Sequence, residues 1–253
     1  MPFRTGRSAA LALCASLASA GIAAAADIPY PVKAAPPPPA LQLPAGWAGF
    51  YVGGQVGYGS DSVHWRNLGA SAFFSPLDAL TIDRGSGVIG GGQAGYNLQF
   101  GRVVLGIEGS LSAADFDRSF ASPWFPATDV WSSKLTWLGT VTGRLGYGFD
   151  AWMPYLKAGL AAGNVDTSIA NTAAGALAQG SAVHYGWTAG GGVEVKLAPR
   201  FSLGLEFMHT DLGRNTDING AAAGAATGTV ESYAVGVRSN SIMARFNYLF
   251  GGR

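Results

Sequence analysis

The sequence lacks the features that define several common classes of protein. Its 253 residues include a single cysteine, Cys14, and charged side chains make up only 12%. No apolar run reaches the roughly 18 residues that a membrane-spanning helix needs. The 16 basic and 15 acidic side chains nearly balance, so no basic surface for nucleic acid is expected. These absences argue against a disulfide scaffold, a helical membrane protein and a nucleic-acid-binding domain.

The first 26 residues are typical of a secretory signal peptide. Arg4 and Arg7 form a basic start, residues 9–22 an apolar stretch, and residues 24–26 an Ala-Ala-Ala cleavage site. An uncleaved anchor is the alternative, and the shortness of the apolar stretch argues against it. Cleavage predicts a mature chain without cysteine, with 14 basic against 15 acidic residues once Arg4 and Arg7 are removed.

Residues 27–46 are rich in proline and include the run Pro36–Pro39. Such a segment favours the extended polyproline II conformation and does not enter the interior of a sheet. We interpret it as a periplasmic spacer that leads into a domain covering residues 47–253. A tether to the cell wall or to a partner is the alternative interpretation.

Residues 133–149 alternate between apolar and polar side chains. One face carries Leu135, Trp137, Val141, Leu145, Tyr147 and Phe149, and the other carries Lys134, Thr136, Thr140, Thr142 and Arg144. A period of two predicts a strand with different surroundings on its two sides. The stretch is about three times longer than a typical soluble strand, which favours a tilted strand that crosses a bilayer.

The same pattern occurs in eight segments after Trp47. Tight turns near residues 100–102, 150–152 and 198–200 alternate with long links near residues 60–86, 114–132, 164–182 and 211–236. Short turns on one side and long loops on the other are typical of outer-membrane barrels. We predict an all-β fold, an eight-stranded antiparallel up-and-down transmembrane β-barrel in the outer membrane, with both termini in the periplasm.

Aromatic residues near the strand ends predict girdles at the two membrane interfaces. The set comprises Trp47, Phe100, Phe149, Trp152, Trp187, Phe201, Tyr248 and Phe250. A soluble barrel of the lipocalin type would show the same alternation with its apolar face inside. The signal peptide, the aromatic strand ends and the final Tyr248-Leu249-Phe250 favour lipid on the outside.

Four segments carry a resemblance to a known family. They are residues 47–54 (WAGFYVGG), 106–109 (GIEG), 142–147 (TGRLGY) and 204–213 (GLEFMHTDLG). In this order they resemble the Omp25/Omp31-type outer-membrane proteins of alphaproteobacteria, over essentially the whole mature chain. The resemblance implies an eight-stranded barrel of porin-like or surface-antigen character. One departure is that residues 251–253 (Gly-Gly-Arg) follow the terminal aromatic residue that assembly machinery would read.

The predicted inward face carries a set of charged side chains. They are Glu108, Lys134, Arg144, Lys157, Glu194, Lys196, Glu206 and Arg245. Charges in a confined interior are costly, so we expect ion pairs and hydrogen-bonded networks. A charged eyelet that selects small ions is one interpretation of this lumen network. We favour a polar plug, because eight strands leave little room.

Other patterns point less clearly to chemistry. Residues 85–90 match G-x-G-x-x-G, but a strand follows where a nucleotide site needs a helix. The three histidines share no metal-ligand spacing. His209 lies near the outer rim beside Thr210 and Asp211, and this combination leaves a lipid-modifying enzyme as a further alternative.

Aromatic residues also occur in the predicted long links. They are Trp65, Phe73, Phe74, Phe120, Trp124, Phe125 and Trp131. Two interpretations are open: they contact a ligand or a host surface, or they pack together over the barrel mouth.

Taken together, these patterns predict a monomeric Gram-negative outer-membrane protein with a structural, envelope-maintaining and surface-antigen role. We expect no enzymatic activity, no cofactor and no metal. A narrow porin-like channel for small solutes, or loop-mediated ligand binding and adhesion, are the alternatives. The expected partners are outer-membrane lipid and the barrel-assembly machinery, which would read the C-terminal strand.

Overall fold

The computed structural model describes residues 46–68, 76, 80–173, 176–221 and 230–250. These residues contain eight β-strands and no helix long and apolar enough to span a bilayer. The predicted signal peptide and, apart from Gly46, the predicted spacer lie outside the described residues. The strands are β1 (Gly49–Asn67), β2 (Leu80–Phe100), β3 (Val103–Ala121), β4 (Asp129–Tyr147), β5 (Trp152–Asn171), β6 (Ala176–Ala198), β7 (Phe201–Ala221) and β8 (Val230–Leu249).

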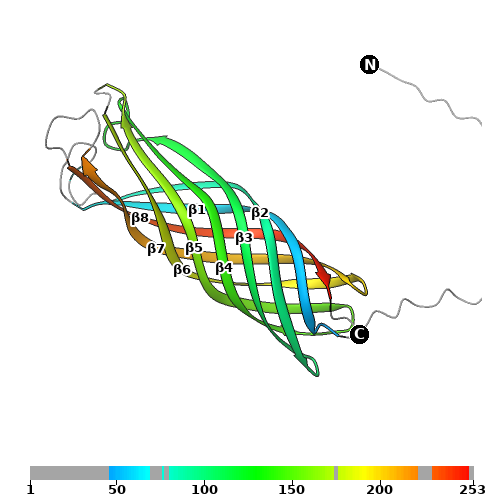
Figure 1. Cartoon of the computed structure of the whole chain (residues 1–253). Helices are drawn as coiled ribbons and strands as arrows, with labels where there is room; N and C mark the ends of the chain where they lie inside the picture. Colours follow the sequence, from blue (N-terminus) through cyan, green and yellow to red (C-terminus); the bar gives the residue numbers. More distant parts are fainter. Residues whose placement is uncertain (1–45, 69–75, 77–79, 174–175, 222–229, 251–253) are drawn as a thin grey trace, which may run out of the picture. The chain divides into compact units, whose positions relative to one another are not determined.

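The strands pair antiparallel in chain order, and β1 also pairs with β8, which closes the barrel (Figure 1). Closure removes the sheet edges, as hydrocarbon requires, because an unpaired backbone group there costs several kcal/mol. Short connections join β2 to β3, β4 to β5 and β6 to β7 at one end, which we call the short-turn end. The predicted eight-stranded antiparallel barrel is therefore confirmed.

The strands are longer than the sequence pattern predicted. Each has 19 to 23 residues and continues into the predicted links. The prediction of four loops of this extent is wrong, because these Gly-, Ala- and Ser-rich segments still alternate between the two faces of the sheet. At about 3.3 Å per residue and a tilt near 40°, the barrel is roughly 50 Å tall, about twice the apolar band of an outer-membrane barrel.

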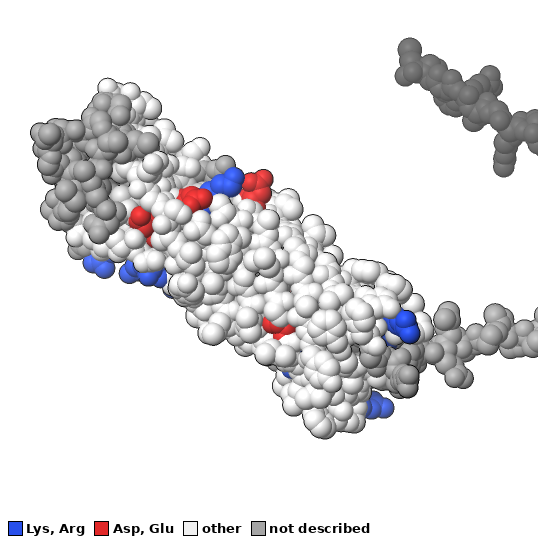
Figure 2. Space-filling model, viewed as in Figure 1, with Lys and Arg blue, Asp and Glu red and all other residues white. Residues whose placement is uncertain are grey.

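The exterior changes character along the barrel axis. In the half next to the short turns, the lower half, exposed outward residues are apolar, for example Val56, Leu156 and Phe246. In the upper half, outward positions are mostly polar, among them Ser60, Arg66, Arg84, Asp115, Gln179, Arg238 and Asn240. Figure 2 shows charged side chains on the upper half and at the short-turn end, with a largely uncharged surface between them apart from one small acidic patch.

The interior changes in the opposite sense. The upper half holds a continuous apolar core whose larger members are Val63, Trp65, Ile89, Phe116, Trp131, Leu135, Val165, Ile169, Leu212, Ile218, Tyr233, Val235 and Val237. The lower half encloses buried polar and charged side chains, described below. Only the lower half therefore has the apolar-out, polar-in arrangement of a wall that meets lipid.

A β-bulge in β4 corrects the alternation predicted for residues 133–149. The register between β4 and β5 shifts between Leu135 and Trp137. One extra residue turns the side chains beyond it to the other face of the sheet. Leu135, predicted to face lipid, is therefore buried in the upper core. Lys134, predicted to lie in the lumen, points outward with its side chain 43% exposed.

Candidate functional site

The candidate site is the charged network in the lower half of the lumen. It is formed by inward positions of six strands, and its charged members are Glu108, Arg144, Lys157, Glu194, Lys196, Glu206 and Arg245. Each of these side chains belongs to a residue that is at most 4% exposed. The structure thus places seven of the predicted network residues inside the barrel, and Lys134 outside it.

The first part of the network is a ring of two carboxylates and two cations. Lys157 Nζ lies 2.6 Å from Glu108 Oε1 and 3.1 Å from Glu206 Oε2. Arg245 donates through one guanidinium nitrogen to Glu108 and through the other to Glu206. Each cation therefore bridges both carboxylates, so the ring is neutral and each charge has two partners of opposite sign.

Two tyrosines complete this ring. The Tyr51 hydroxyl donates to Glu108 at 2.5 Å, and the Tyr155 hydroxyl donates to Glu206 at 2.8 Å. Arg245 also donates to the Tyr155 hydroxyl at 3.1 Å. Both tyrosines fall on the polar face of the sequence pattern, so their inward direction was predictable. Their hydrogen-bond partners on other strands were not.

The second part of the network is centred on Glu194. This carboxylate accepts hydrogen bonds from Arg144 and Ser202, and from Asn247 at 2.9 Å. The Arg144 guanidinium also lies over the Tyr155 ring, 3.7 Å from its centroid. This cation–π contact joins the two parts of the network into one polar layer across the lumen.

Lys196 and Trp47 close the lumen at the short-turn end. Lys196 Nζ donates to the carbonyl of Gly46 at 2.6 Å and lies 4.6 Å from the Trp47 ring centroid. The Trp47 indole donates to the carbonyl of Phe149 at 3.0 Å. The ring packs with Val104 and Met153 and is fully buried.

Trp47 was predicted to belong to the membrane-interface girdle, and this prediction is wrong. Trp47 precedes β1, so the alternation of that strand does not define its direction. Gly49 has a φ of 122°, a conformation that glycine adopts readily, and here the chain turns from the barrel mouth into the wall. The indole consequently enters the mouth instead of facing lipid.

The other predicted girdle residues lie on the exterior. Phe149 stacks on Trp152 at 4.3 Å between ring centroids, and Phe201 contacts Tyr248 at 5.3 Å. Phe100 and Phe250 are exposed at the same end, and Trp187 is exposed near the upper edge of the apolar band. These aromatic side chains mark the two borders of that band.

A small cavity of mixed lining lies between the charged network and the upper core. Polar side chains line part of it, among them Gln55, Ser112, Thr188, Thr210, Ser241, Lys157 and Glu206, and Ile89, Leu138, Met208 and Met243 of the upper core line the rest. Its volume of about 20 Å³ corresponds to roughly one water molecule. The described residues therefore leave little free space at this level of the lumen.

Aromatic rings fill the upper end of the barrel. The Trp131 ring lies 5.3 Å from Trp65, 5.7 Å from Tyr233 and 6.0 Å from Phe120, measured between centroids. Trp65, Phe120 and Trp131 were predicted in loops and instead belong to strands, where they pack over the mouth. Trp124 and Phe125 are exposed in the connection between β3 and β4, while Phe73 and Phe74 lie outside the described residues.

The remaining sequence candidates do not assemble a catalytic or metal site among the described residues. His209 Nδ1 contacts Asn240 Oδ1 at 2.8 Å. Thr210 is buried on the opposite face and contacts Thr188, while Asp211 binds Arg238. Residues 85–90 are part of β2, and no group of three metal-ligating side chains occurs in the described chain.

A buried pair that the sequence pattern did not predict is His184 with Asp217. The His184 Nε2 and Asp217 Oδ1 atoms are 2.8 Å apart, and both side chains are fully buried. Asp217 lies at the second of two register shifts in β7, between Thr216 and Ile218. After a bulge of this kind, the alternation of the sequence no longer predicts which face of the sheet a side chain lies on.

A closed barrel with an apolar exterior band and a packed polar interior is the architecture of an outer-membrane β-barrel protein. The sequence comparisons agree. The family described as "Outer membrane protein beta-barrel domain" matches residues 10–245. The chain belongs to this family, within its Omp25/Omp31-like group from alphaproteobacteria.

Named relatives are about 30% identical to this chain over the aligned regions. The 25 kDa outer-membrane immunogenic protein of Brucella abortus is 30% identical over 86% of this chain and 90% of its own length. The 31 kDa outer-membrane immunogenic protein of Brucella melitensis is 31% identical over 66% of this chain and 72% of its own length. Among solved structures, the outer membrane protein OprG from Pseudomonas aeruginosa matches with a TM-score of 0.49 and 16% identity, over 83% of this chain and 99% of its own.

Proposed function

We propose that this protein is a non-conducting structural barrel that maintains the outer membrane and presents its upper end at the cell surface as an antigen. The observation that carries the proposal is the filling of the lumen at three levels. Trp47 and Lys196 occupy the short-turn end, the rest of the charged network spans the lower half above them, and an apolar core occupies the upper half. The immunogenic relatives support a role as a surface antigen.

We further infer that the short-turn end faces the periplasm. β1 begins and β8 ends at this end, where Tyr51 pairs with Leu249. Short turns face the periplasm in barrels of this kind, and the upper half then extends into the external medium. Its polar exterior suits that position. A cysteine placed at Ser168 should react with a membrane-impermeant maleimide on intact cells, whereas one placed at Asp150 should not. The reverse labelling would contradict this orientation.

The conductance of purified protein in planar bilayers tests the proposal. We expect no steady ion-selective current from the parent protein. The Arg144→Ala and Trp47→Ala variants should also remain silent, because the upper core still fills the lumen. A steady unitary current in the parent whose ion selectivity changes with Arg144→Ala would overturn the proposal in favour of a narrow porin-like channel.

One observation favours a second function, ligand binding or adhesion through a surface connection. Trp124 and Phe125 are 42% and 44% exposed. The Ser122 hydroxyl accepts hydrogen bonds from both of their backbone amides, at 3.2 and 3.3 Å. The aromatic pair is therefore held outward by an ordered turn. Loss of cell adhesion in a Trp124→Ala/Phe125→Ala variant, with unchanged surface expression, would support this function.

We infer no enzymatic activity and no cofactor, and we propose a monomer. When the purified protein is incubated with lipid A, we expect mass spectrometry to detect no loss or transfer of acyl chains. The C-terminal strand remains the proposed contact for the assembly machinery. Residues 251–253 lie outside the described chain.

A further inference from the structure

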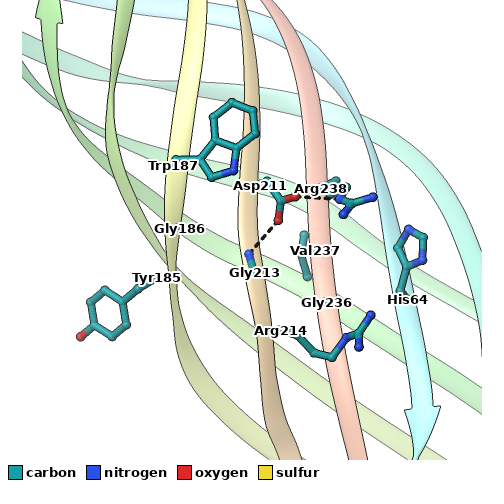
Figure 3. Close-up of a pocket in the computed structure, with 10 residues that line it drawn as sticks. All are labelled: His64, Tyr185, Gly186, Trp187, Asp211, Gly213, Arg214, Gly236, Val237 and Arg238. Carbon is teal, nitrogen blue, oxygen red and sulfur yellow. Dashed lines mark hydrogen bonds and ion pairs between the residues drawn. The ribbon is translucent and has the colours of Figure 1, made fainter.

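A groove on the outer face of the barrel combines basic and aromatic side chains. It lies across β6, β7, β8 and β1 and has a volume of about 500 Å³. His64, Arg214 and Arg238 line it together with Asp211, and Tyr185 and Trp187 border it (Figure 3). None of these residues belongs to the lumen network.

Local irregularity in β7 shapes this groove. The register between β7 and β8 shifts between Asp211 and Arg214, where Gly213 has a φ of 68°. Such a bulge moves the strand out of the regular ladder and redirects its side chains. Gly236 on β8 has no side chain, and the Arg214 side chain lies beside it. The bulge and the glycine together create a depression over which two guanidinium groups are held.

The groove carries an excess of positive charge. Arg238 Nε lies 2.7 Å from Asp211 Oδ2, and the other Asp211 oxygen accepts the Gly213 amide at 2.8 Å (Figure 3). The Arg238 side chain remains 57% exposed, so part of its guanidinium is accessible. Arg214 forms no ion pair with the described residues and is exposed. Arg84 lies on the neighbouring strand β2, where it pairs in register with Ser62, two residues from His64.

The groove lies at the upper border of the apolar band. On β8 the exposed Ile242 is the last apolar outward residue, and Asn240 and Arg238 are the next two outward positions. Trp187 on β6 pairs in register with Asp211 and is half exposed. Tryptophan and tyrosine concentrate at membrane–water interfaces, and lipid headgroups begin directly beyond the hydrocarbon. The basic side chains therefore reach the level of the headgroups.

We propose that this groove binds the phosphate group of an outer-leaflet lipid. Arginine binds phosphate through paired N–H donors, and basic pockets at the membrane border recognise anionic headgroups. The lipid chains would lie against the apolar band below Tyr185 and Trp187. The volume accommodates a phosphorylated sugar as well as the phosphate itself. This inference rests on the proposed orientation, with the upper half outside the cell.

Native mass spectrometry of the purified, folded barrel tests the inference. The probe is lipid A carrying its phosphates, compared with lipid A from which both phosphates have been removed. We expect Arg214→Gln/Arg238→Gln to bind the phosphorylated form at least about tenfold more weakly and the dephosphorylated form unchanged. Arg102→Gln/Arg200→Gln removes the same charge from the short turns and should bind like the parent. Arg214→Lys/Arg238→Lys keeps both charges and should retain part of the affinity that the glutamine variant loses.

Each other outcome overturns the inference. Equal weakening in both double variants would indicate general electrostatic attraction, and no change in either would remove the groove as the site. Displacement of the lipid by submillimolar inorganic phosphate would assign the groove to free phosphate.

Binding that depends on Arg214 and Arg238 would stand even if the protein conducted ions, so this result is separable from the conductance test. A labelling result that places the upper half in the periplasm would remove the outer-leaflet assignment.

Discussion

The lower and upper halves of the barrel share the same strands but reverse the distribution of polar groups. Along β8, Arg245 and Asn247 face inward and Phe246 faces outward in the lower half. In the upper half of the same strand, Val235 and Val237 face inward and Arg238 faces outward. The change occurs within one strand that keeps its alternation. The polarity of the barrel interior therefore changes with height along the barrel axis, and it follows the medium that surrounds the barrel at each height.

The two halves also depend on different stabilising interactions. In the lower half, lipid covers the outside and buried charges must compensate one another, because unpaired charges in a low-dielectric interior are very costly. In the upper half, water covers the outside and apolar side chains gain free energy by leaving it. The upper half thus resembles a soluble barrel placed on top of a membrane barrel.

The strongest test of this comparison breaks the charge balance of the lower half. Arg245→Ala leaves Glu108 and Glu206 with only Lys157 as a cation, and we expect a loss of about 3–5 kcal/mol in the free energy of unfolding. Urea unfolding of protein refolded into lipid vesicles measures it. Arg200→Ala, which removes an arginine bound to Tyr248 on the exterior, is the control and should cost less than about 0.5 kcal/mol.

A companion variant separates charge from packing. Arg245→Met combined with Glu108→Gln keeps one carboxylate and Lys157, so the ring stays neutral. It should lose less stability than the sum of the two single variants. Additive losses would contradict a coupled network.

The second test compares the two exteriors on one strand. Leu160 and Ser168 both point outward on β5, the first in the apolar band and the second above it. Lys at position 160 should destabilise the barrel by about 2–4 kcal/mol in vesicles, because it places a charge in hydrocarbon. Lys at position 168 should change stability by less than about 0.5 kcal/mol. Similar costs at both positions would mean that the apolar band extends into the upper half.

The third test concerns the upper core. Ile169 is fully buried there, so Ile169→Val should cost about 0.5–1.5 kcal/mol through lost contacts. Ile169→Thr has nearly the same shape as the valine variant but adds a hydroxyl. It should cost more, since this hydroxyl would be buried without a hydrogen-bond partner. The difference between the two variants in urea unfolding reports the polarity of this interior. No difference would indicate that water reaches the upper core.

Much of this arrangement was predictable from the sequence, because a period of two assigns each side chain to a face. Glu108, Arg144 and Arg245 were placed on the polar face for this reason, and the structure buries them. The partners within the network were not predictable. Which carboxylate meets which cation depends on how far neighbouring strands are displaced along one another, and the sequence pattern does not encode that displacement.

The incorrect predictions arise where the period is interrupted. Trp47 lies before β1, and Lys134 lies beyond the bulge at Leu135/Trp137. For the same reason the sequence pattern made no prediction for Asp217, which lies at a register shift in β7 between Thr216 and Ile218. The extent of the strands was underestimated for a different reason. In the upper half the outward side chains are mostly polar and many inward ones are apolar. A search for strands with apolar outward faces therefore stops at the membrane border.

The smallest predicted effect comes from comparing two lysines, Lys134 on the exterior and Lys157 in the lumen. Lys134 Nζ lies 4.0 Å from Asp115 Oδ1 on the exterior, where solvent screens the pair, so Lys134→Ala should cost about 0–1 kcal/mol, less at high salt. Lys157→Ala in the lumen removes a cation from two buried carboxylates and should cost about 3–5 kcal/mol with little dependence on salt. Urea unfolding at low and high ionic strength measures both. A large, salt-independent cost at Lys134 would place that side chain in the interior network after all, and with it the register of the upper part of β4.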